Sequence, residues 1–142
     1  MQHCSHESKL IRALGVVAAG QTVQRSGSVD TLGYQGVEIA VLIGSIDATG
    51  TVKVQLEYSD DNANWTAHPS AVDFGAADDN KMAVLDAFPA PGRYVRALVT
   101  RGTADSAIEA VVARLYRGIE QPPARDASEK GLVRFVGANA LT

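Results

Sequence analysis

"TVKVQLEY", residues Thr51–Tyr58, alternates apolar and polar side chains without a break. The apolar positions are Val52, Val54, Leu56 and Tyr58. The polar positions between them are Thr51, Lys53, Gln55 and Glu57. Because successive side chains of a β-strand point to opposite faces, the pattern predicts a strand with one buried face and one wet face.

The segment before it, residues 36–44, reads "GVEIAVLIG". One of its faces is β-branched and the other is mostly apolar, which predicts a central strand covered on both sides. Residues 45–50 have the composition of a turn, so the two strands are expected to form an antiparallel hairpin.

The next 40 residues continue the pattern. Residues 69–80 are rich in Asp, Ala and Gly and predict a long loop with one short apolar patch, Val72–Phe74, and residues 81–86 predict a short strand. The strong breaker at residues 89–92 precedes another alternating run, residues 93–100. Strands about ten residues apart, separated by Gly, Pro and Asp turns, are typical of a β-sandwich or jelly roll.

Two segments are ambiguous. Ser106 to Glu109 has the capping-box pattern that starts helices, and five apolar positions follow at helical spacing: Ile108, Val111, Val112, Leu115, Tyr116. Residues 10–17 are open to the same two interpretations. Periodicity alone leaves both segments undecided between helix and strand.

The chain of 142 residues predicts one domain. We expect a flexible N-terminal end at residues 1–9, the β-sandwich at residues 10–118 and a C-terminal arm at residues 119–142. The arm opens with a linker-like stretch, residues 121–126, and then reads "LVRFV" at residues 132–136, which predicts one more strand or an arm docked on a neighbour. A lone exposed apolar strand is a liability for a free monomer, so a docked tail is the favoured expectation.

Composition excludes several classes of protein. The chain is 46% hydrophobic and 20% charged, as soluble globular proteins are, and its apolar runs are far too short for a membrane helix. The net charge of −3 comes without a basic stripe, so no direct contact with nucleic acid is expected. The single Cys4 and the lack of an export-signal pattern at the start favour assembly in a reducing cytoplasm.

The loop "DDNAN", Asp60–Asn64, is the strongest candidate for an ion or sugar site. Its oxygen-bearing side chains match the first half of a calcium loop, but Trp65 and Ala71 stand where that loop needs glycine and glutamate. A sialidase-type Asp-box matches only loosely. A hairpin turn whose side chains bond their own backbone is the favoured interpretation, with Trp65 resuming the next strand.

No catalytic constellation is visible in the sequence. His68 stands alone, and the acidic pairs, Asp60–Asp61 and Asp78–Asp79, lie in polar turns, whereas acid-base catalysis needs a partly buried pair on a rigid frame. We therefore expect no enzyme, no cofactor and no metal site.

Four runs resemble a family of small tailed-bacteriophage virion proteins that includes head decoration, or cement, proteins. They are "VDTLGYQGVEIAVLIGSID", "VKVQLEYSDDNANWTAH", "GRYVRALVTRG" and "AIEAVVARLYRG", within residues 10–118. Two positions depart from the family pattern, Glu57 before the Ser-Asp-Asp and Ala63 in place of a glycine. The resemblance implies a β-sandwich, with residues 106–117 as a strand, and a homotrimer bound to the major capsid protein outside the head of a virion assembled in the host cytoplasm.

A decoration protein needs surfaces that contact the shell or a neighbouring copy. We expect these contacts from the two ends, residues 1–20 or 120–142, and from exposed aromatic residues. The candidate interface residues are Leu10, Ile11, Tyr34, Leu132, Val133, Phe135 and Val136.

Two other functions remain open from the sequence. One is a carbohydrate-binding or adhesion module with Trp65 and Tyr58 as a stacking platform, which requires both rings to be exposed together. The other is a different virion part, such as a tail or head-completion protein.

Overall fold

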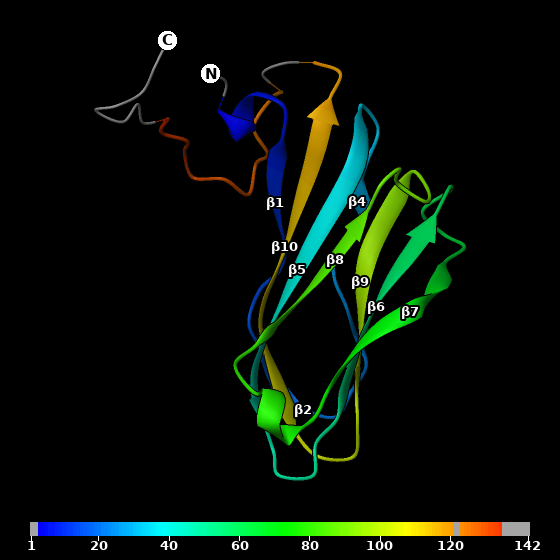
Figure 1. Ribbon diagram of the computed structural model, residues 1–142, viewed down its shortest axis with the longest axis vertical. Helices are drawn as coiled ribbons and strands as arrows, with labels where there is room; N and C mark the ends of the chain where they lie inside the picture. Colours follow the sequence, from blue (N-terminus) through cyan, green and yellow to red (C-terminus); the bar gives the residue numbers. More distant parts are fainter. Residues whose placement is uncertain (1–2, 121–122, 135–142) are drawn as a thin grey trace.

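The computed structural model describes residues 3–120 and 123–134, and its strands form two antiparallel sheets that face each other (Figure 1). The predicted all-β sandwich is confirmed. Two short 3-10 turns, η1 (Cys4–His6) and η2 (Ala76–Asp78), lie outside the sheets.

The first sheet has the order β1-β10-β5-β8, and β2 also pairs with β10. Its strands are β1 (Lys9–Leu14), β2 (Val17–Gly20), β5 (Tyr34–Ile46), β8 (Met82–Ala87) and β10 (Ser106–Gly118). The two longest strands, β5 and β10, lie side by side at its centre.

The second sheet has the order β3-β9-β6-β7, and β4 also pairs with β9. Its strands are β3 (Gln24–Arg25), β4 (Val29–Asp30), β6 (Val52–Ser59), β7 (Thr66–Phe74) and β9 (Tyr94–Arg101). The predicted hairpin of residues 36–44 and 51–58 therefore does not form, because β5 and β6 belong to opposite sheets.

The core lies between the sheets and follows the alternation of the sequence. Val52, Val54 and Leu56 of β6 are buried, and Tyr58 packs against them, as "TVKVQLEY" predicts. On β5 the alternate residues Val37, Ile39, Val41 and Ile43 fill the opposite side of the same core. Glu57 is the exception to the pattern, since it points outward but is only 5% exposed.

Residues 106–117 are strand throughout, as the family resemblance implies and against the helical spacing. The register of β10 against β5 shifts between Ser106 and Ile108 and again between Ile108 and Ala110. A β-bulge adds a residue, so the inward positions jump from Ile108 to Val111 before alternation resumes. This jump of three produced the helical spacing. In the other ambiguous segment, residues 10–14 belong to β1, residues 15 and 16 lie between strands, and Val17 begins β2.

The predicted loop at residues 69–80 is wrong in its first half. Strand β7 continues to Phe74, and the Val72–Phe74 patch belongs to it. The register of β7 against β6 shifts between Gln55 and Glu57, opposite the stretch that contains Pro69. The bulge lets an edge strand tolerate proline, which cannot donate to a ladder.

Strand β5 is central, as residues 36–44 predicted, but only one of its faces is covered. No second layer within the described residues lies on the outer side of the first sheet, where Ala40 and Leu42 are half-buried. The expectation of cover on both sides is therefore wrong for the described chain.

The C-terminal arm runs along β1, as its described part shows in Figure 1. The backbone N–H of Arg12 donates to Ser128 Oγ over 3.1 Å, Arg125 donates to the Ser8 carbonyl over 2.6 Å, and Pro123 is buried. The arm thus docks on the edge of its own sheet.

Among the described residues, no helix is long and apolar enough to cross a membrane.

Candidate interaction surfaces

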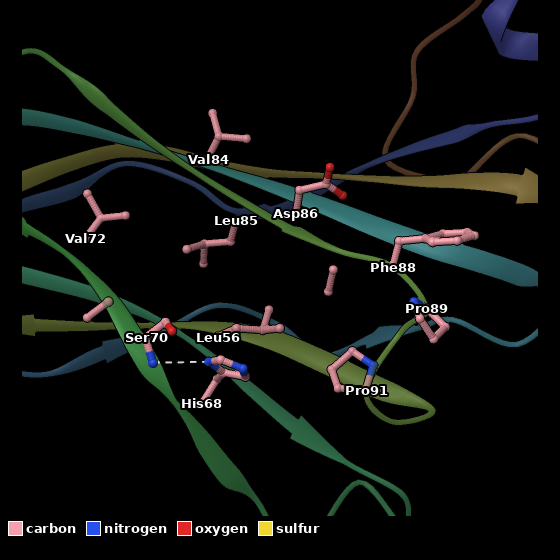
Figure 2. Close-up of a pocket in the computed structure, with 12 residues that line it drawn as sticks. Leu56, His68, Ser70, Val72, Val84, Leu85, Asp86, Phe88, Pro89 and Pro91 are labelled. Carbon is pink, nitrogen blue, oxygen red and sulfur yellow. Dashed lines mark hydrogen bonds between the residues drawn. The ribbon is translucent and has the colours of Figure 1, made fainter.

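The first candidate surface is a groove between β7 and β8, the neighbouring edge strands of the two sheets (Figure 2). Its volume is about 500 Å³. Within the described residues, β8 pairs only with β5 and β7 only with β6, so each strand presents an unpaired edge beside the groove. The groove is the place where the sandwich stays open along one side.

The groove is mostly apolar. Leu56, Val72 and Leu85 line it from three strands, and Phe88, Pro89 and Pro91 stand at one end (Figure 2). The polar side chains in it are His68, Ser70 and Asp86. His68 Nδ1 accepts a hydrogen bond from the Ser70 backbone N–H at 3.1 Å, which orients that ring toward its own strand.

Asp86 is engaged on the outer side of β8. Its Oδ1 accepts the hydroxyl hydrogen of Tyr116 at 2.6 Å, and burial together with this bond raises the pKa of Tyr116 to about 12. Figure 2 places Asp86 and His68 on opposite sides of the groove, so the two do not form an acid-base pair. The apolar lining suits an extended apolar segment.

The second surface is an apolar face on the outer side of the first sheet. Leu42 is opposite Met82 and Ala110 across the ladders, and Ala40 is opposite Val84 and Val112. Met82 is 61% exposed and Val84 48%. These six residues are called the apolar face below. Contiguous exposed apolar surface of this kind marks an interaction site in soluble proteins.

The outer side of the second sheet is charged instead. Arg25 and Arg96 donate to the two oxygens of Glu57 over 3.1 and 3.0 Å, which explains how this carboxylate is buried. The Arg96 guanidinium also lies 3.9 Å from the ring centroid of Trp65. Glu57, one of the two departures from the family pattern, thus links β3, β6 and β9 through its two arginines, and Arg96 extends the contact to Trp65 after the loop.

A sugar-stacking platform of Trp65 and Tyr58 does not form in this geometry. One face of Trp65 is covered by Arg96, and Tyr58 packs against the core from the other side of β6. The two rings therefore do not present a shared exposed surface.

The loop Asp60–Asn64 is a turn built around Asp61. The Asp61 carboxylate accepts hydrogen bonds from the backbone N–H groups of Ala63 and Asn64, the Asn64 side chain and the Ser59 hydroxyl, at 2.6 to 2.9 Å. These bonds lower the pKa of Asp61 well below its ordinary value, with the backbone bonds the largest cause. Asn62 takes a positive φ of 60°. The Asp61 oxygens are thus used within the turn, and no cluster of three potential metal ligands occurs in the described part of the chain.

The candidate interface residues do not come together as one patch. Leu10 is exposed on the outer side of β1, whereas Ile11 and Tyr34 pack against the core. Leu132 and Val133 are exposed in the arm, where Val133 reaches 70% exposure. Phe135 and Val136 lie outside the described residues.

Sequence reasoning missed both the groove and the apolar face. The signal for the face was present in residues 36–44, which are apolar on both sides and predicted a second cover. No comparable signal marked the groove, because it depends on which strands end up at the edges of the two sheets.

Comparisons with known proteins show a similar fold but identify no family. No protein-family model matches the chain, and no curated protein matches it in sequence. The crystal structure of the PBSX exported protein XepA is similar, with a TM-score of 0.55 and 15% sequence identity. The match covers 100% of this chain and 49% of XepA, so the chain spans about half the length of that protein. At this identity the likeness concerns the fold alone.

Proposed function

We propose that this chain is a phage structural protein that binds the outside of a capsid as a decoration, or cement, protein. The observation that carries the proposal is the apolar face, an outer sheet surface on which Met82 and Val84 remain 61% and 48% exposed. The partner in this proposal is the major capsid protein, and the copies act as a homotrimer.

A likeness in sequence supports a role in phage structure, and a likeness in fold is compatible with it. Four sequence runs resemble small tailed-phage virion proteins, and the fold is similar to that of the PBSX exported protein XepA. The described residues add no acid-base pair in the groove and no metal-ligand cluster. The surfaces fit binding better than chemistry.

The mechanism is a shift of equilibrium. A protein that binds the closed shell but not its separated subunits stabilises the shell by mass action. Three linked copies that contact neighbouring subunits gain further from effective concentration, so each contact can be weak. The apolar face supplies such contacts because burying apolar surface contributes roughly 25 cal/mol per Å².

The test is co-sedimentation of the purified chain with capsids that lack it. Leu42→Glu places a charge at the centre of the apolar face, and we expect capsid occupancy to fall at least tenfold. The matched control is Thr100→Glu, an exposed position on the outer side of the second sheet, which should leave occupancy unchanged. Equal binding by wild type and Leu42→Glu would remove the apolar face from the proposal.

A further inference from the structure

We propose that the free edge of β8 and the groove beside it accept the segment Leu132–Val136 of a second copy as an added strand. This inference rests on the proposed function, in which the copies act as a multimer. It names the two surfaces that join one copy to the next.

The acceptor is a strand edge above an apolar groove. Strand β8 pairs only with β5 among the described residues, so its other edge presents unpaired backbone groups. Such an edge is a template for another strand, and alternate side chains of that strand would enter the groove beside it. Leu56 and Leu85 line the groove where those side chains would enter.

The donor is a strand-forming sequence whose described residues, 132–134, lie in no sheet. Residues 132–136 read Leu-Val-Arg-Phe-Val, and Val and Phe favour strands. The described part, residues 132–134, has no regular secondary structure, and Val133 is 70% exposed. Within its described residues, one chain therefore holds both an unpaired strand edge, on β8, and the start of a strand-forming segment that lies in no sheet.

The side chains of donor and acceptor match in pattern. The outward side chains of β8 are apolar Val84 and acidic Asp86, and apolar Phe88 follows just beyond the end of the strand. Alternate residues of the donor are apolar, basic, apolar: Leu132, Arg134, Val136. With Arg134 beside Asp86, the donor residues Val133 and Phe135 point the other way, toward Leu56 and Leu85 in the groove. Tyr116 occupies Oδ1 of Asp86, and Oδ2 is the oxygen that Arg134 would take.

The donor cannot reach the groove of its own domain. Ser128 is held on the outer edge of β1, at the opposite side of the sheet from β8 (Figure 1). Crossing from there to a strand added outside β8 takes roughly 24 Å at about 4.8 Å per strand. The four residues from Ser128 to Leu132 span at most about 14 Å. The donor must therefore come from another copy.

This contact joins the edge of one copy to the arm of the next, so it is head-to-tail. Head-to-tail contacts form a ring when the rotation closes, and a trimer is such a ring. In forming it, Arg134 exchanges its present hydrogen bond to the Ser5 hydroxyl, 2.8 Å long and exposed, for the bond to Asp86.

The test uses charge reversal in the full chain, with molar mass measured by light scattering at fixed concentration. Wild type should be a multimer. Asp86→Arg and Arg134→Asp each place like charges together, and each should lower the association constant at least tenfold. The double variant Asp86→Arg/Arg134→Asp should restore the wild-type mass. Loss of the Ser5 bond cannot explain that restoration, because the double variant lacks the bond as well.

Lys53→Asp, an exposed charge reversal on the outer side of the second sheet, is the matched control and should keep the wild-type mass. A monomeric wild type, single variants with unchanged mass, or a double variant that stays dissociated would each overturn the inference. Because these measurements contain no capsid, they are separate from the co-sedimentation result. Capsid binding by a chain that fails the association test would leave the proposed binding to the capsid standing and would remove this contact between copies; a monomeric wild type would remove the homotrimer as well.

Discussion

The hydroxyl of Ser128 accepts a hydrogen bond from the backbone N–H of Arg12 at 3.1 Å, and this contact places the C-terminal arm on the edge of β1. The two edges of the first sheet are therefore unlike, since β1 is covered by the arm and β8 is open in the described structure. A covered edge is protected from pairing with other chains, whereas an open edge invites it.

Arg125 secures the arm and is the residue to test first. Its guanidinium donates to the Ser8 carbonyl over 2.6 Å and lies 3.5 Å from the Glu129 carboxylate. We expect Arg125→Ala to release the arm, at a cost of about 1–2 kcal/mol for the lost charged hydrogen bond. Hydrogen exchange at the Arg12 amide should then accelerate. Lys130→Ala, at an exposed position of the same arm, should leave that exchange rate as it is.

Glu57 holds together β3, β6 and β9 through Arg25 and Arg96. Glu57→Ala leaves two arginines without their shared acceptor, and we expect the free energy of unfolding to fall by about 1–3 kcal/mol. Arg96 should also leave its position over Trp65, which changes the tryptophan fluorescence of the folded state. Lys53→Ala on the same strand and face should change neither quantity. Full stability in Glu57→Ala would mean that the buried ion pairs make no net contribution.

The turn at Asp61 should give stability a defined dependence on pH. Its pKa is lowered in the folded state from the ordinary value of 3.8, so its contribution is present above that value and is lost as pH falls below it. Asp61→Asn retains one oxygen acceptor and no charge, so it should be less stable than wild type at pH 7. The difference should shrink when both are unfolded by urea at pH 3. An equal difference at both pH values would contradict this account of the turn.

Arg101 is a buried guanidinium held by backbone carbonyls. It is 6% exposed and donates to the carbonyls of Ala18, Thr22 and Ser106 over 2.6 to 2.9 Å. Lysine cannot reach three carbonyls in this fork geometry, so Arg101→Lys should lower the free energy of unfolding by about 2 kcal/mol or more. Arg93→Lys, at an exposed pair with Asp30, should change the free energy of unfolding far less than Arg101→Lys under the same urea titration, because water and salt screen exposed ion pairs.

The sequence predicted the class of fold because alternation is a local property. Val52, Val54 and Leu56 are buried as their spacing indicates. The failures occur where register shifts interrupt alternation, as between Ile108 and Val111, or where a bulge carries a strand past Pro69. The sequence also did not predict which strands pair with each other, because a short connection from β5 to β6 fits either a hairpin or a change of sheet.

The candidate surfaces were harder to predict than the fold. Ala40 and Leu42 signalled a second cover for β5, but the sequence did not show that the cover is missing from the described chain. The groove arises from the adjacency of β7 and β8, whose neighbours are set by the whole topology. Of the predicted interface residues, Leu132 and Val133 are exposed in the arm and enter the proposed contact between copies.

The most direct test of the central claim is a reconstruction, by electron microscopy, of virions with and without this chain. We expect density for a two-sheet sandwich on the outside of the capsid, with the apolar face of Leu42, Met82 and Val84 turned toward the shell. Capsids whose outer surface is the same with and without the chain, or density for the chain at the tail alone, would contradict the account.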